Sequence, residues 1–197
     1  MNKSQFIEFV KDECKKHNVK CVLKNTEYLR IDGITCTGLF YPEGKLVVAM
    51  KSSQGYEVLL HEYCHMTQWL EKIPEWKNHQ KIDADKFNGW LSGNPCRSIK
   101  KYIQWIIDIE LDNEKRAVKT IKRLGLDFID INMYIKKANV YVQFYNWVLR
   151  NRKWSKPNKP MYKSKEILAL VPSKFNMDYT KISDKLNKAM CFHYNNG

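Results

Sequence analysis

The chain has 197 residues and 44% of them are hydrophobic, which is enough for the core of one domain with at most a small appended lobe. No apolar run reaches the roughly 18 residues that a membrane-spanning helix requires, and the N-terminal segment lacks the apolar core of a signal peptide. Residues 99–197 hold 20 basic and 9 acidic residues, and so carry most of the formal net charge of +13. We therefore expect a basic cytoplasmic protein with no membrane segment.

The first fifty residues combine one helix with short strands. A helix is expected at about 4–16, because apolar residues there recur at helical spacing after a capping serine. Two strands are expected at about 18–24 and 27–31. Two β-prone runs within 34–50, joined by a turn with Pro42 at its second position, predict a hairpin.

A helix expected at about 56–72 contains the most informative motif of the chain, H-E-x-x-H at His61-Glu62-Tyr63-Cys64-His65. Residues four apart on a helix share a face, so His61 and His65 can direct two imidazoles at one metal ion. Glu62 is placed on the same helix to take a proton from a water on that metal. The alternative is a core helix with two hydrogen-bonded histidines and no metal.

A catalytic zinc site needs a third protein ligand, and the best candidates lie in a long helix expected at 98–125. Glu110 and Glu114 share a face with apolar residues three and four positions away. A buried carboxylate is costly unless it is paired, hydrogen-bonded or bound to a metal. In the alternative register the apolar face is centred on Ile106 and Leu111, and both acids are half exposed.

Six cysteines are spread along the chain without a C-x-x-C pair. This spacing argues against a disulfide scaffold, and we expect reduced thiols. Cys64 lies inside the metal motif, but its helical position turns it away from both histidines, so it is expected to be a packing residue.

The remaining helices are expected at about 80–92, 130–148 and 180–190. We expect one domain over residues 1–153 and a basic extension over 154–197 that packs on the same domain. The segment 150–165 has seven basic residues, no acidic residue and two aromatic ones. Basic residues interleaved with aromatic ones can bind phosphates and stack on bases. A solvated basic surface is the alternative.

This pattern resembles the gluzincins, the zinc metallopeptidases typified by thermolysin, in which a glutamate ligand and a second acid follow H-E-x-x-H on a later helix. The resemblance covers about the middle third of the chain. It implies a zincin-like α+β fold, with a small N-terminal β-sheet packed on the active-site helix and a mostly helical C-terminal half. It also implies zinc held by His61, His65 and Glu110, Glu62 as the base, and Glu114 orienting a ligand.

Two departures leave the third ligand open between the two acids. Glu110 follows His65 by 45 positions, which is longer than in compact gluzincins, and Glu114 stands where the family often has aspartate. The longer spacing also resembles the SprT-like and ImmA-like zincins. SprT-like proteins usually use a third histidine, for which His79 is the candidate; we favour Glu110.

The resemblance extends to the chemistry around the metal. Gluzincins often stabilise the oxyanion with a downstream Tyr or His, and we select Tyr141 for this role. The alternatives for the same role are Tyr134, Tyr145 and His193. SprT-like proteases act near DNA, which agrees with nucleic-acid binding by the basic segment. The strand before the motif would bind an extended peptide as an added strand.

We therefore expect a cytoplasmic zinc metallopeptidase that hydrolyses peptide bonds with water activated by Glu62. One alternative is a hydrolase of a non-peptide amide. Another is a basic protein that binds nucleic acid or a protein partner and has a structural or degenerate metal site. The intact Glu62 argues against that last alternative, because a structural site does not need a base beside its ligand.

Overall fold

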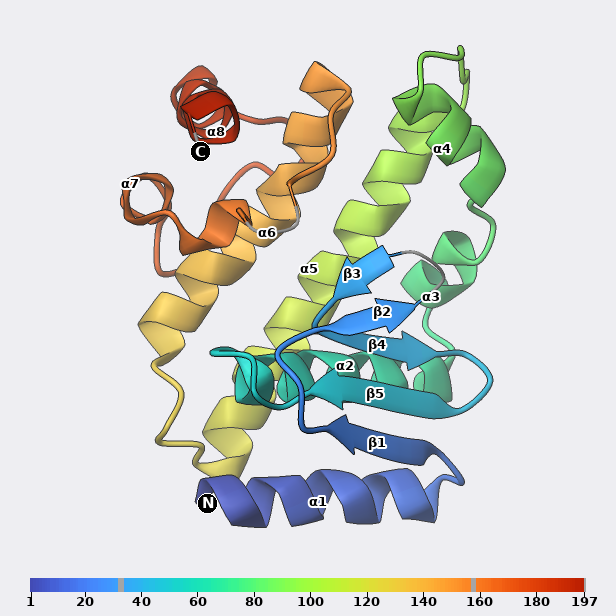
Figure 1. Cartoon of the computed structure of the whole chain (residues 1–197), viewed down its shortest axis with the longest axis vertical. Helices are drawn as coiled ribbons and strands as arrows, with labels where there is room; N and C mark the ends of the chain where they lie inside the picture. Colours follow the sequence, from blue (N-terminus) through green and yellow to red (C-terminus); the bar gives the residue numbers. More distant parts are fainter. Residues whose placement is uncertain (32–33, 157–158, 197) are drawn as a thin grey trace. The chain divides into compact units, whose positions relative to one another are not determined.

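A computed structural model describes residues 1–31, 34–156 and 159–196 and shows a mixed α+β protein (Figure 1). The chain divides into two compact units. The first contains Met1–Lys72 and Asn113–Ile131, and the second contains Ile73–Asp112 and Asn132–Gly197. The expected boundary between residues 153 and 154 lies inside the second unit, so the basic extension belongs to the same unit as the helix that precedes it.

The first unit is built on a three-stranded sheet in the order β1-β5-β4. Its strands are β1 (Lys20–Lys24), β5 (Lys45–Ala49) and β4 (Gly38–Tyr41). The central strand β5 pairs parallel with β1 and antiparallel with β4. Four successive residues of β5 are buried, as a strand covered on both faces requires.

A break at Thr37 divides the hairpin that we expected at 34–50. The strand β3 (Ile34–Cys36) pairs antiparallel with β2 (Leu29–Ile31) as a separate two-stranded sheet. Only β4 pairs with β5, so the predicted hairpin is confirmed for that strand pair alone. The turn between β4 and β5 ends in Gly44, whose φ of +84° is a conformation that favours glycine.

Two helices cover one face of the three-stranded sheet. The helix α1 (Lys3–Lys16) lies beside β1, and α2 (Gly55–Glu71) packs on β4 and β5 (Figure 1). Both were predicted to within one residue at each end. The opposite face of β5 supplies Val47 and Ala49 to a small cluster with Leu29 of β2. The helix α2 is therefore held against a sheet that is itself packed on both sides.

All the regular elements among the described residues of the second unit are helices. Its complete elements are α3 (Pro74–His79), α4 (Ala84–Leu91), α6 (Ile131–Asn151), the 3-10 helix η1 (Met161–Lys163), α7 (Lys165–Leu168) and α8 (Asp184–Asn196). The helix α5 (Ile99–Leu124) begins in this unit and continues without interruption into the first. The predictions of α4, α5 and α6 are confirmed. The predicted last helix begins about four residues too early, and α3 and α7 were not predicted. No described helix is long and apolar enough to span a membrane.

A row of buried amide side chains on α6 holds the irregular chain between α7 and α8. Asn139, Gln143 and Asn146 are at most 4% exposed. Their Nδ2 or Nε2 groups donate to main-chain carbonyls of Pro172, Lys174, Asp178 and Tyr179 at 2.7–3.0 Å. An irregular segment cannot satisfy its own carbonyls, so these amides replace the hydrogen bonds that a helix would have provided.

We expect Asn139→Ala to lower the free energy of unfolding by about 2–4 kcal/mol, because two carbonyls would lose their donor. Urea denaturation of the purified chain measures the change. Asn195→Ala is the matched control, because Asn195 lies exposed on α8 and its loss should cost less than about 0.5 kcal/mol. Equal effects of the two substitutions would contradict the role given to the α6 amides.

Candidate metal centre

The two histidines of the motif converge on one point beside α2. His61 and His65 lie one turn apart, with ring centroids 4.6 Å apart and ring planes at 86°. Their Nε2 atoms are 3.1 Å apart. Two nitrogens that each lie 2.0–2.1 Å from a tetrahedral zinc are about 3.3 Å apart. The separation therefore suits two imidazoles that share one metal ion.

Each histidine is oriented through its other ring nitrogen. His61 Nδ1 lies 3.1 Å from Glu114 Oε1, and His65 Nδ1 lies 2.8 Å from Gln68 Oε1. A carboxylate oxygen and an amide oxygen only accept hydrogen bonds, so each ring donates to its neighbour in the tautomer that carries the hydrogen on Nδ1. Both Nε2 atoms then carry lone pairs, which is the tautomer that binds metal. The two acceptors are almost completely buried: Glu114 is 5% exposed and Gln68 is not exposed at all.

Asn113 links α5 to the same histidine. Its Nδ2 atom lies 3.3 Å from the main-chain oxygen of His61 and 2.9 Å from the ring Nδ1. The amide donates to the main-chain oxygen, and in the tautomer with a hydrogen on Nδ1 this is the only one of the two contacts in which it can donate. Asn113 is completely buried, so this contact fixes the main chain of His61 in a site without competing water.

Glu110 completes a group that can hold a metal ion. A carboxylate oxygen of Glu110 and ring nitrogens of His61 and His65 all lie within 4.8 Å of one another. The helix α5 is continuous here, so the position of Glu110 follows from that of Glu114 one turn later. Glu110 is 8% exposed. Two imidazole nitrogens and one carboxylate oxygen are a donor set that suits zinc and leave a position open for another ligand.

The burial pattern of α5 separates the two registers that the sequence allowed. Glu110 and Glu114 are buried, whereas Ile106 and Leu111 are only partly buried. The register with inward-facing acids is therefore the one adopted. His79 is exposed at the end of α3 and does not belong to the described metal group.

Glu62 lies against the edge strand β4 at a position where no side chain would fit. Glu62 is 7% exposed. A Cβ atom at Gly38 would lie 2.9 Å from both Cγ and Oε1 of Glu62, and closer still to Val58 Cγ1. Burial, together with the negative charge of Glu62, raises the pKa of the neighbouring Cys36 thiol. The carboxylate of Glu62 is thus confined between α2 and the start of β4.

The tyrosine selected for the oxyanion role contacts the third metal-binding candidate. The hydroxyl of Tyr141 donates to Glu110 Oε1 at 3.3 Å and lies 3.1 Å from the hydroxyl of Tyr145. Both tyrosines are on α6, one turn apart, with their rings edge to face. His193 does not belong to the metal group among the described residues, and Tyr134 is buried near the start of α6.

Three residues of the site were not singled out from the sequence. Gln68 carried a signal, since a polar residue three positions after His65 lies on the same inward face of the helix. Asn113 carried a weaker one, as the neighbour of Glu114. Nothing in the sequence marked Gly38, because a sequence does not show which helix a glycine in a strand contacts.

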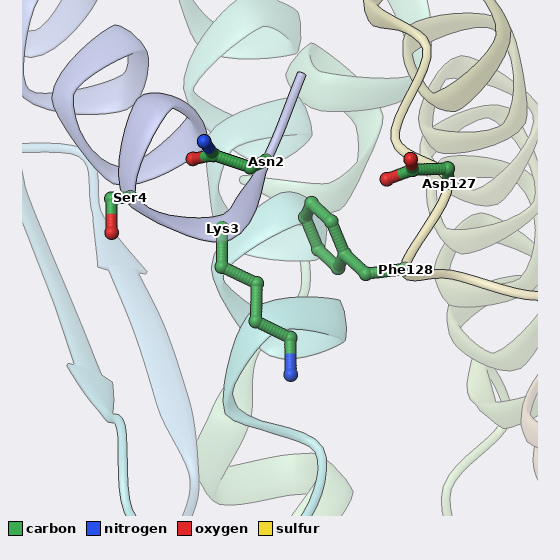
Figure 2. Close-up of a pocket in the computed structure, with 5 residues that line it drawn as sticks. All are labelled: Asn2, Lys3, Ser4, Asp127 and Phe128. Atoms are coloured by element: carbon green, nitrogen blue, oxygen red, sulfur yellow. The ribbon is translucent and has the colours of Figure 1, made fainter.

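One hollow lies elsewhere in the first unit, at the start of α1. It has a volume of about 310 Å³ and is lined by Asn2, Lys3, Ser4, Asp127 and Phe128 (Figure 2). The side chain of Asn2 already accepts the main-chain N–H of Gln5 and so caps the helix. None of the residues in the metal group lines this hollow.

Comparison of the chain with protein-family models, curated proteins and solved structures finds no match. A functional assignment therefore depends on the residues and geometry of this chain.

We expect Gln68→Ala and Glu114→Gln each to weaken zinc binding by about 10–100-fold. The first removes the acceptor beside His65, and the second replaces the carboxylate beside His61 with a neutral amide, whose oxygen accepts more weakly. Competition with a chromophoric chelator measures the affinity. Gln104→Ala is the matched control, since Gln104 lies on α5 and its side chain donates a hydrogen bond to Asp108 and to no residue of the described metal group. Unchanged affinity in both Gln68→Ala and Glu114→Gln would show that the Nδ1 contacts do not orient the ligands.

We expect Gly38→Ala to lower the free energy of unfolding by about 1–3 kcal/mol, because the added methyl group overlaps Val58 and Glu62. Adding Val58→Ala should recover part of the loss. Gly89→Ala in α4 is the control, because its Cβ would meet nothing closer than 3.4 Å and alanine favours a helix by about 0.5–1 kcal/mol. Thermal or urea unfolding reports all three, and a neutral Gly38→Ala would contradict the close approach.

Proposed function

We propose that this chain is a zinc-dependent metallopeptidase of the minimal gluzincin type. The observation that carries the proposal is the pair of histidines whose Nδ1 atoms lie beside the buried oxygens of Glu114 and Gln68 and whose Nε2 atoms lie 3.1 Å apart. Glu110 supplies a third ligand atom within reach of both.

Zinc bound by His61, His65 and Glu110 would polarise a substrate carbonyl and lower the pKa of a water molecule in its remaining position. With such a metal bound, Glu62 would take a proton from that water and pass it to the leaving amine. Its confinement against Gly38 supports this role, because a base acts best when its carboxylate has a fixed direction. A purely structural metal site would not need a buried carboxylate next to its ligand.

A peptide substrate is favoured by the strand next to Glu62. The strand β4 lies at the edge of its sheet, and its first residue packs against Glu62. An edge strand can pair with an extended peptide through its main chain, which would bring a peptide bond alongside α2. A hydrolase of a small amide would have no use for such an edge, so the peptide substrate is preferred.

Tyr141 is proposed to act mainly through Glu110. Its hydroxyl is already engaged by the Glu110 carboxylate and by Tyr145. A donor held in this way orients the third ligand, as a neighbouring group orients a metal-bound carboxylate. This differs from the oxyanion role that the sequence suggested for Tyr141.

We expect Glu62→Gln to retain about one zinc per chain and to lose peptide hydrolysis, because an amide cannot accept the water proton. Casein or a quenched fluorescent peptide is the substrate, and a chelator defines the metal-independent background. Glu57→Gln, one turn earlier on α2 and hydrogen-bonded to Gln54, is the matched control and should remain active.

Elemental analysis of His61→Ala and His65→Ala completes this test, because each removes one of only three ligands and should abolish stoichiometric zinc. Zinc retained by both histidine variants, or full activity in Glu62→Gln, would refute the proposal.

A further inference from the structure

The basic charge of the chain is concentrated in one part of the second unit. Residues 132–197 contain 13 Lys and Arg against 3 Asp and Glu. Two of the three acids are paired locally: Asp184 with Arg150 at 2.7 Å and Asp178 with Lys181 at 3.4 Å. The third, Glu166, accepts a hydrogen bond from Ser164. Most of the cations in this part therefore have no carboxylate to neutralise them.

The two arginines at the start of the basic segment serve the fold. Arg150 pairs with Asp184, and Arg152 donates to the main-chain oxygens of Trp90 and Asn94. The guanidinium of Arg152 also lies 5.3 Å from the ring centre of Trp90. These contacts tie the chain that follows α6 to Trp90, Asn94 and α8, so neither arginine is assigned to the proposed site.

The two lysines that follow converge on one aromatic ring. The Nζ atoms of Lys153 and Lys156 each lie 5.1 Å from the ring centre of Tyr194 on α8. They are therefore within about 10 Å of each other, which is no more than one Debye length at 0.1 M salt. No carboxylate of the described residues forms an ion pair with either lysine. Two exposed ammonium groups held close without a counter-charge favour a polyanion.

An aromatic side chain lies between these lysines in the sequence and is half exposed. Trp154 is 48% exposed. Its ring packs against Phe144 at 5.2 Å and 77°, and against Phe87 and Tyr145 at 6.2 Å. The contacts fix the orientation of the indole and leave part of it open to solvent. An immobilised, exposed indole beside two cations suits a nucleobase that follows a phosphate.

We propose that Lys153, Trp154 and Lys156, with Tyr194 beneath the lysines, form a binding site for single-stranded nucleic acid. The lysines contact phosphates and the indole stacks on a base. An acidic peptide would use the lysines but gain little from the indole, and a duplex would keep its bases from stacking on it. This site does not depend on the proposed hydrolysis, and it lies within the second unit.

The test measures the affinity of the full chain for a labelled oligothymidylate of twenty nucleotides by fluorescence anisotropy at 25–200 mM NaCl. We expect the double substitution Lys153→Gln/Lys156→Gln to weaken binding at least about tenfold at 50 mM salt. The slope of the logarithm of the binding constant against the logarithm of the salt concentration should become shallower by roughly 1.4, or about 0.7 for each lost phosphate contact. Lys185→Gln/Lys188→Gln makes the same charge change on exposed positions of α8 and should have less than half that effect. Equal effects of the two pairs would overturn the site.

Trp154→Leu separates stacking from charge while keeping an apolar side chain against Phe144. It should weaken oligothymidylate binding by about fivefold or more and leave duplex binding unchanged, because stacking requires an exposed base. Circular dichroism verifies that each variant is folded. The proposal is overturned if the natural chain does not bind oligothymidylate at 25 mM salt. It is also overturned if two results occur together: Trp154→Leu has no effect, and the chain binds polyglutamate of equal charge or phosphatidylserine vesicles as tightly as it binds the oligonucleotide.

Discussion

The hydrogen bonds from the Nδ1 atoms of His61 and His65 are the constraint on which the rest of the site depends. They select the tautomer, set the rotation of both rings and direct both Nε2 atoms to one place. One acceptor, Gln68, comes from the next turn of the same helix, and the other, Glu114, comes from α5. A buried carboxylate and a buried amide are costly when unpaired. The histidines and their acceptors therefore stabilise one another in a single arrangement.

The three-stranded sheet constrains Glu62, which lies where α2 meets β4. The central strand β5 is buried on both faces, so it gives α2 a rigid base. The edge strand β4 approaches α2 so closely that only glycine fits at position 38. His61 is thus fixed by a contact with α5, His65 by a contact within α2, and the neighbouring Glu62 by the shape of a strand. Two different kinds of contact orient adjacent residues of one motif.

Many elements of the fold and residues of the candidate site could be predicted from the sequence, for identifiable reasons. The helices α1, α2 and α5 were predicted because each has a sustained apolar stripe, and the inward acids of α5 followed from the cost of burying a carboxylate. The short helices α3 and α7 have six and four residues, too few for a period to appear. The break at Thr37 and the partners of Gln68, Asn113 and Gly38 depend on which elements meet in space. Local periodicity carries no information about that.

The place of β4 at the edge of its sheet also has a bearing on how the protein behaves at high concentration. An edge strand does not discriminate among extended partners, and the strand of a second copy can pair with it as readily as a peptide can. Natural proteins limit such self-association with short edge strands, and β4 has only four residues. Leu39, 37% exposed at its centre, works in the opposite direction. Self-association through β4 and the binding of an extended ligand to β4 would therefore compete, and such a ligand would also reduce aggregation.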